Sequence, residues 1–165
     1  MIESKYLKND IKNIQKLMVI PALRNFEIES LGRLVSLSKI RRYEDGETII
    51  LEGDNDPWLF FLLAGGIRVE KDGVEISTTS QMGEMFGEMR LLDNQGRSAN
   101  VFAVGKTMCL AVNTQATEKM GSNDRSANFL LLLYKVFAEY VSMRLRLANE
   151  ELVKLRSETA ASKSR

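Results

Sequence analysis

Residues 83–92 read Gly-Glu-Met-Phe-Gly-Glu-Met-Arg-Leu-Leu, and residues 96–99 read Gly-Arg-Ser-Ala. This pattern indicates the end of a strand, a glycine, one short helical turn, and an arginine that enters the next strand. A glycine before a helical turn lets backbone N–H groups approach an anion closely. The fork-shaped guanidinium of Arg97 suits a charge-assisted contact with phosphate, and the hydroxyl of Ser98 adds one more hydrogen bond.

Glu88 lies in the same loop, and its carboxylate would be repelled by a phosphate, because both groups are negatively charged. It either accepts hydrogen bonds from the hydroxyls of a ribose or pairs with Arg97. The set of side chains therefore suits a phosphate that is joined to a sugar. From the residues alone, a purely structural role for the loop, held by a Glu88–Arg97 salt bridge, carries equal weight.

Short apolar runs separated by glycine-containing turns surround this loop. The runs are Thr48–Leu51, Trp58–Leu63, Ile67–Glu70 and Val74–Ser77. The turns are Asp45-Gly46, Gly53-Asp54, Gly65-Gly66 and Asp72-Gly73. Short, regularly spaced strands of this kind predict a compact antiparallel roll over residues 41–113, with a hairpin across Asp72-Gly73. We expect Leu62, Ile67 and Val69 to be core residues of the roll.

Helical periods flank the predicted roll. Residues 1–40 are expected to form helices, broken near Pro21. Ile11, Ile14, Leu17 and Met18 form one apolar face there, and Leu31, Leu34 and Val35 form another. After the roll, residues 114–155 are predicted to form the C-terminal helices, and residues 156–165 a flexible tail.

An apolar stripe along the long C-terminal helix alternates steps of four and three residues. Its members are Tyr134, Ala138, Val141, Leu145, Ala148, Leu152 and Leu155. A heptad-spaced seam of this kind favours a second helix beside the first, most simply in a parallel homodimer through residues 134–155. Association with a different helix and burial of the stripe within its own domain stay open as alternatives.

Composition excludes several classes of function. The 165 residues predict a single domain. Lys and Arg number 23 against 22 acidic residues, so the charge balance argues against DNA binding by this chain alone. The chain has no His and one Cys, Cys109, which removes most metal sites and every His-dependent triad. We expect Cys109 to be a core residue and the protein to be no enzyme.

Targeting features are also absent from the sequence. The N-terminus has no hydrophobic signal core, and the longest apolar run, Phe129 to Tyr134, is too short to cross a bilayer. We therefore expect a cytoplasmic protein with no membrane contact.

The segment Phe-Gly-Glu-x-x-Leu-Leu at residues 86–92, followed by Arg-Ser-Ala at 97–99, resembles the phosphate-binding cassette of cyclic-nucleotide-binding domains. The spacing of nine residues from Glu88 to Arg97 fits that family, and so do Gly46-Glu47 and Glu52-Gly53-Asp54 upstream. The resemblance covers residues 20–150. It implies an α+β domain: an antiparallel, jelly-roll-like β-roll with N-terminal helices, a short phosphate-binding helix and a long C-terminal helix, the cassette occupying residues 83–99.

The resemblance also implies roles for individual residues. Gly87 and the backbone of Met89 would meet the cyclic phosphate of cAMP or cGMP. Glu88 would accept from the ribose 2′-hydroxyl, Arg97 would pair with the phosphate, and Ser98 would bond the phosphate or the purine. A serine rather than a threonine at position 98 favours cAMP.

Three further site candidates are less determined by the pattern. Arg90 stands where the family has a small residue, so it adds a phosphate contact, points into solvent or obstructs the ligand. Within the long helix, Arg144 is expected towards the site and Asn149 near the purine edge. A surface position for Arg144 is an equal alternative.

No helix-turn-helix, kinase, cyclase or channel segment follows the long helix in this sequence. We therefore expect a stand-alone, bacterial-type regulatory module without an effector domain and without a cofactor. It would bind a cyclic mononucleotide and relay occupancy through its C-terminal helix to a separate protein effector. The alternative is a fold of this family that has lost its ligand and serves as a dimerisation or interaction scaffold.

Overall fold

A computed structural model describes residues 1–20, 23–24, 26–88, 96–115 and 124–163. The chain divides into two compact units, Met1–Asn123 and Asp124–Arg165, which we describe separately. The predicted break at Pro21 lies outside the described residues.

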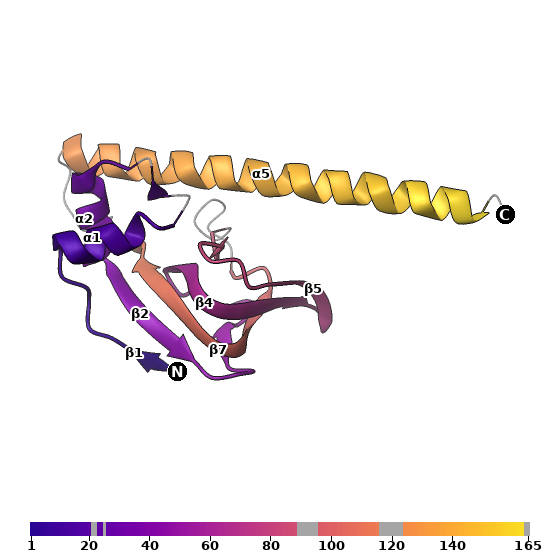
Figure 1. Cartoon of the computed structure of the whole chain (residues 1–165), viewed down its shortest axis with the longest axis horizontal. Helices are drawn as coiled ribbons and strands as arrows, with labels where there is room; N and C mark the ends of the chain where they lie inside the picture. The colour runs from indigo at the N-terminus through magenta and orange to yellow at the C-terminus, as the bar shows by residue number, and fades with distance from the viewer. Residues whose placement is uncertain (21–22, 25, 89–95, 116–123, 164–165) are drawn as a thin grey trace. The chain divides into compact units, whose positions relative to one another are not determined.

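The first unit is built on an antiparallel sheet (Figure 1). Its strands are β1 (Ile2–Glu3), β2 (Ser38–Tyr43), β3 (Thr48–Ile50), β4 (Trp58–Lys71), β5 (Val74–Thr79), β6 (Met85–Phe86) and β7 (Asn100–Asn113). The strand order is β1-β2-β7-β4-β5, with β3 also pairing with β7 and β6 with β4. The predicted α+β class with an antiparallel β-roll is confirmed.

The strand β4 corrects one detail of the sequence prediction. Trp58–Leu63 and Ile67–Glu70 are not separate strands but parts of one continuous strand that bends at Gly65-Gly66, where its register against β7 shifts. Gly65 has a φ of +81°, and a Cβ there would lie 2.7 Å from the Cα of Thr107. The two glycines therefore mark the irregularity in β4, where the left-handed φ and the closeness of β7 at Gly65 both require glycine.

The predicted hairpin joins β4 to β5. Lys71 pairs with Val74, and the two residues between them, Asp72 and Gly73, have φ of 51° and 76°. Positive φ at both central residues suits a two-residue hairpin loop with the twist of the flanking strands. The hairpin prediction across Asp72-Gly73 is confirmed.

Two short helices, α1 (Ile11–Leu17) and α2 (Ile28–Ser36), precede the roll. Leu31, Leu34 and Val35 are fully buried as predicted, whereas the first predicted face is only half right. Ile14 and Leu17 are buried, but Ile11 is 73% exposed and Met18 42% exposed. The reason is that α1 has only seven residues, so its buried side has room for only two side chains.

Residues 1–40 are also less helical than predicted. Ile2–Glu3 forms β1, and β2 begins at Ser38 rather than after residue 40. A two-residue strand carries too little sequence pattern to be recognised, because it is specified by its pairing with β2.

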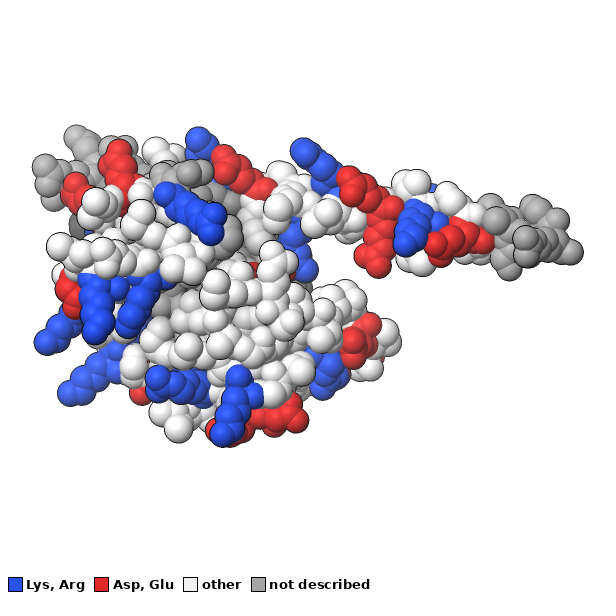
Figure 2. Space-filling view, viewed as in Figure 1, with Lys and Arg blue, Asp and Glu red and all other residues white. Residues whose placement is uncertain are grey.

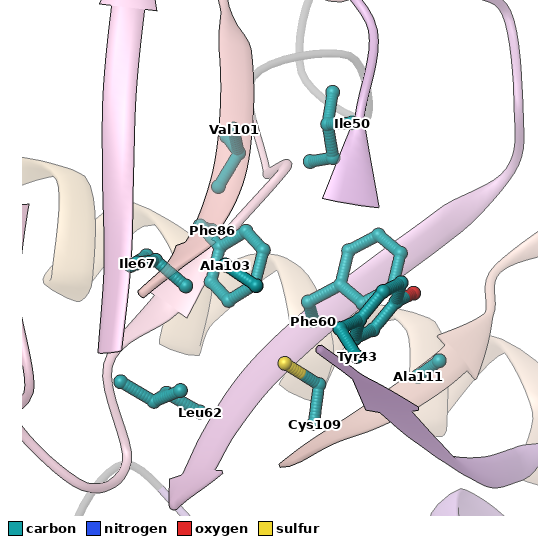
Figure 3. Close-up of a cluster of buried hydrophobic side chains, with 10 residues drawn as sticks. All are labelled: Tyr43, Ile50, Phe60, Leu62, Ile67, Phe86, Val101, Ala103, Cys109 and Ala111. Atoms are coloured by element: carbon teal, nitrogen blue, oxygen red, sulfur yellow. The ribbon is translucent and has the colours of Figure 1, made fainter. Parts of the chain in front are cut away.

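Side chains from five strands meet in the interior of the roll (Figure 3). Leu62, Ile67 and Cys109 are buried there as predicted, and Val69 is partly buried against them. Burial raises the pKa of the Cys109 thiol to about 12, which leaves it protonated and inert. Burial likewise raises the pKa of Tyr43 to about 12, against a smaller opposing effect of the Arg41 guanidinium.

The second unit is one helix, α5 (Asp124–Lys163), of 40 residues. The predicted flexible tail from residue 156 is wrong as far as Lys163, because a chain without Gly or Pro continues the helix. Figure 2 shows acidic and basic side chains interspersed along this helix. Among the described residues, no helix has the length and apolar content needed to traverse a bilayer.

We expect Gly65→Ala to lower the free energy of unfolding by about 2–5 kcal/mol. The left-handed φ costs a non-glycine residue ~1–2 kcal/mol, and the forced overlap with β7 adds ~1–3 kcal/mol. Urea unfolding followed by circular dichroism measures the loss. Gly46→Ala is the control, because Gly46 has a φ of +75° but nothing within 4 Å of the added Cβ. Equal losses in the two variants would show that the bend at Gly65 imposes no packing constraint.

Candidate functional site

Gly87 follows β6 directly, and β6 is held against β4 by pairing of Phe86 with Phe60. The residue has a φ of +82°, which favours glycine. A Cβ at this position would lie 2.6 Å from Nη1 of Arg97. Glycine is therefore required for two reasons, the backbone conformation and the closeness of the arginine.

The Arg97 side chain is buried in the roll although it carries a charge, with 4% of the residue exposed. Its Nη1 donates to the carbonyl oxygen of Gly87 at 2.7 Å, and its Nη2 donates to the carbonyl oxygen of Trp58. Its Nε and Nη2 also donate to the two carboxylate oxygens of Asp56, at 3.0 and 2.6 Å. Four of its five N–H bonds are thus directed at described residues, and the second hydrogen on Nη1 has no acceptor among them.

Asp56 is the main site residue that sequence reasoning missed. It forms a bidentate pair with Arg97 from 41 positions away in the chain, and its side chain is 33% exposed. The carboxylate that pairs with Arg97 among the described ion pairs is that of Asp56, and a Glu88–Arg97 salt bridge is not among them. No local motif marks Asp56, although an acid between Gly53 and Trp58 close to a phosphate motif is a weak signal.

The backbone around Arg97 is fixed by the loop between β3 and β4. The Arg97 N–H donates to the carbonyl of Asp54, and the Gly53 N–H donates to the carbonyl of Arg97, both at 2.9 Å. Lys71 adds a further contact, since its Nζ donates to the carbonyl of Ser98 at 2.8 Å and to the carboxylate of Glu52 at 2.6 Å. The hydrogen bond from Lys71 lowers the pKa of Glu52, and the same contact raises the pKa of Lys71.

The other predicted cassette residues have different surroundings. Glu88 is buried, with 8% of the residue exposed, directly after Gly87. Ser98 is exposed at the surface, with its carbonyl bound by Lys71. Met89 and Arg90 lie outside the described residues, as does the short helix predicted to follow Gly87.

Arg144 and Asn149 belong to α5 and so to the second unit. Both side chains are exposed on the helix. The guanidinium of Arg144 lies 5.9 Å from the ring centroid of Tyr140, one turn earlier on the same helix. The first unit brings together Gly87, Glu88, Arg97 and Ser98, whereas the contribution of these two residues stays a prediction.

The arrangement places a buried cation beside a glycine turn of the kind that lets backbone approach an anion. A fixed guanidinium lies against a glycine whose Cβ would collide with it, and a buried carboxylate follows that glycine. Within the described ranges, no three His, Cys, Asp or Glu side chains are grouped as they would be around a metal ion. The one thiol is buried and protonated.

Comparison with known proteins identifies the family. The model of the cyclic nucleotide-binding domain matches residues 40–124, and the chain belongs to this family. Over 95 residues it is 39% identical to "Glutaminase 1" of Bradyrhizobium diazoefficiens, a match that covers 57% of this chain and 15% of that protein.

Two further similarities point to regulatory proteins. Over 108 residues the chain is 34% identical to the cAMP-dependent protein kinase type II regulatory subunit of Drosophila melanogaster, covering 62% of this chain and 27% of that one. It also matches the crystal structure of the Thermus thermophilus catabolite activator protein at a TM-score of 0.63 and 28% identity, covering 82% and 62% of the two chains. The chain spans about a seventh of the glutaminase and about a quarter of the regulatory subunit.

We expect Asp56→Asn to lower the free energy of unfolding by about 1.5–3 kcal/mol, the value of hydrogen bonds to a charged group. The change leaves the buried guanidinium of Arg97 without its counter-charge. Chemical denaturation measures the difference from wild type. The matched control is Asp54→Asn two positions earlier, where the side chain is exposed and only the backbone contacts Arg97. Equal stability of the two variants would show that the Asp56–Arg97 pair contributes nothing to the fold.

Proposed function

We propose that this chain binds a cyclic mononucleotide, cAMP in preference to cGMP, and relays its presence through α5 to a protein partner. The observation that carries the proposal is Arg97, a buried guanidinium held between Asp56 and the carbonyl of Gly87. A cation fixed in this way next to a glycine is oriented for a phosphate before one binds. Family membership supplies the class of ligand.

Each described cassette residue has a role in this proposal. The remaining N–H of Arg97 and the backbone at Gly87 meet the cyclic phosphate. The carboxylate of Glu88 accepts from the ribose 2′-hydroxyl, the role that the family resemblance implies for this position. Ser98 bonds the phosphate or the purine. The roles that the family resemblance implies for Met89 and Arg90, which lie outside the described residues, and for Arg144 and Asn149 of α5 stay predictions.

The preference for cAMP rests on serine rather than threonine at position 98. The relatives include proteins named cAMP-dependent and proteins named cGMP-dependent, so they support a cyclic nucleotide without choosing between the two. As part of the same proposal the chain is regulatory rather than catalytic and acts in the cytoplasm.

A degenerate fold without ligand is the second candidate, and one observation favours it. Asp56 already neutralises Arg97, so the guanidinium has a complete counter-charge without any bound nucleotide. In that case the chain would act as an interaction scaffold. The two candidates differ in a single measurable quantity, the affinity of the wild-type chain for cyclic nucleotides.

Isothermal titration calorimetry with cAMP and cGMP tests the proposal, using wild type and Arg97→Lys. Lysine keeps the charge but loses the fork, so we expect affinity to fall about ten- to a hundredfold, the factor that corresponds to one or two charge-assisted hydrogen bonds. Lysine is preferable to alanine here, because alanine would leave Asp56 and two carbonyls without their donor.

Arg42→Lys, on an exposed arginine of β2, is the control and should bind as wild type does. A wild type that binds neither nucleotide at millimolar concentration would refute ligand binding and favour the scaffold. Equal affinity of wild type and Arg97→Lys would show that the phosphate is held by another group.

The relay through α5 is supported by the heptad stripe predicted from the sequence. Its large members are exposed on the helix: Tyr134 is 49% exposed, Leu145 61%, Leu152 47% and Leu155 54%. Burying a leucine is worth ~1.5–3 kcal/mol, so a row of them needs a partner helix. We propose a parallel homodimer through residues 134–155, in which Ala138 and Ala148 allow close approach of the two helices.

We expect Leu145→Glu to convert the dimer to a monomer, because the change brings two like charges together at the seam. Leu147→Glu is the matched control: the same substitution two residues further along α5, at a side chain that is 57% exposed but off the stripe. Light scattering at tens of micromolar protein, with and without cAMP, measures the mass. A monomeric wild type would refute the homodimer, and dissociation by both substitutions would refute the heptad register.

A further inference from the structure

The N-terminal segment lies along β2 as an additional edge of the sheet. Glu3 pairs with Arg41 in the register of β1 and β2. Beyond β1 the contact continues, since the N–H of Ser4 donates to the carbonyl of Ile40 and the N–H of Leu7 to the carbonyl of Ser38, both at 2.9 Å. Figure 1 shows β1 at the outer edge of β2. The first seven residues are thus fixed to the roll by backbone hydrogen bonds.

Glu3 gathers two cations of β2 at this edge. Its carboxylate accepts from Nζ of Lys39 and from Nε of Arg41, each at 2.6 Å. Both cationic side chains are mostly covered, with exposed fractions of 19% and 13%. The hydrogen bond from Lys39, assisted by Arg41, holds the pKa of the Glu3 carboxyl below its ordinary value, so Glu3 is charged at neutral pH. In Figure 2, basic side chains gather over this part of the first unit.

The two cations and Tyr6 enclose the ring of Trp58. The guanidinium carbon of Arg41 lies 4.1 Å from the centre of the indole, and Nζ of Lys39 lies 5.6 Å from it. The ring of Tyr6 stacks on the indole at 6.4 Å. We call Glu3, Tyr6, Lys39 and Arg41 the N-terminal clamp. Cation–π contacts are attractive and strengthen as they are covered from water, so the clamp restricts the position of the indole.

The backbone of Trp58 holds both halves of the Arg97–Asp56 pair. Its N–H donates to Oδ1 of Asp56 at 3.1 Å, and its carbonyl oxygen accepts from Nη2 of Arg97. A displacement of Trp58 therefore moves two groups that fix the Arg97 guanidinium. One is the Trp58 carbonyl, which accepts from it, and the other is the Asp56 carboxylate, which orients it. The clamped ring and these two backbone groups belong to one residue.

We propose that the N-terminal clamp is a positioning element of the nucleotide site, which sets the orientation of the Arg97 guanidinium through Trp58. Arg41 is its principal positioning residue, since it joins Glu3 to the indole without contacting the ligand. This inference rests on the function proposed above, because Arg97 is taken to bind the cyclic phosphate. The affinity of the site then depends on the first seven residues of the chain, which lie outside the cassette.

The test compares Arg41→Met with Arg42→Met. The two arginines are neighbours on β2, but Arg42 is exposed and outside the clamp. We expect the Kd for cAMP to rise about fivefold in Arg41→Met, the effect of losing one cation–π contact, and to change less than twofold in Arg42→Met. Arg41→Lys should restore part of the affinity, because lysine retains a cation over the indole. Glu3→Gln provides a second variant, at a more exposed position, with the same expected direction.

A second measurement needs no ligand. The Nε–H of Arg97 is hydrogen-bonded to Asp56, so its NMR signal should exchange slowly with water in the wild type. We expect faster exchange of this signal in Arg41→Met and Glu3→Gln, and an unchanged signal in Arg42→Met. Urea unfolding of the same variants shows whether any change reflects general loss of stability.

The outcomes separate the clamp from the proposed function. If wild type binds no nucleotide but the Arg97 signal responds to Arg41→Met, the proposed function fails and the positioning role stands. If wild type binds cAMP and Arg41→Met changes neither the Kd nor the Arg97 signal, the clamp is purely structural and the inference is overturned. A loss of stability with an unchanged Kd and Arg97 signal overturns it as well.

Discussion

A buried guanidinium is the constraint around which the first unit is organised. Removing a cation from water costs several kcal/mol unless its hydrogen bonds are replaced inside the protein. Arg97 meets that requirement with one carboxylate and two backbone carbonyls, which come from the loop after β3, from the start of β4 and from the residue after β6. The positions of these three segments are thus tied to a single side chain.

The sheet makes this convergence possible. β3 pairs antiparallel with the first residues of β7, so the loop after β3 and the residues before β7 are brought towards one region. Backbone hydrogen bonds from Arg97 to Asp54 and from Gly53 to Arg97 then hold the two segments together. Because these acceptors already hold the Arg97 guanidinium in one orientation, a ligand would not have to order that side chain on binding. Such preorganisation favours affinity. The phenyl ring of Phe60, 6.0 Å from the guanidinium carbon, connects the site to the core.

Local features were predictable from the sequence, and long-range ones were not. The spacing of Gly87, Glu88 and Arg97 and the turn at Asp72-Gly73 each depend on a few adjacent residues, so the pattern carries them. Asp56 could not be identified, because its role depends on pairing across 41 positions. The same reason hid β1, which is specified by β2 rather than by its own two residues. The continuous strand β4 was read as two because glycine marks bends and turns alike.

Trp58 is the only tryptophan in the chain. Its indole lies under Arg41, and its backbone contacts both Arg97 and Asp56. All of the protein's indole emission therefore originates at a residue whose backbone carbonyl accepts from Arg97 and whose ring lies 4.1 Å from the guanidinium carbon of Arg41. The native polypeptide carries a built-in optical probe at this position, and its fluorescence reports on the surroundings of a single site without any attached dye.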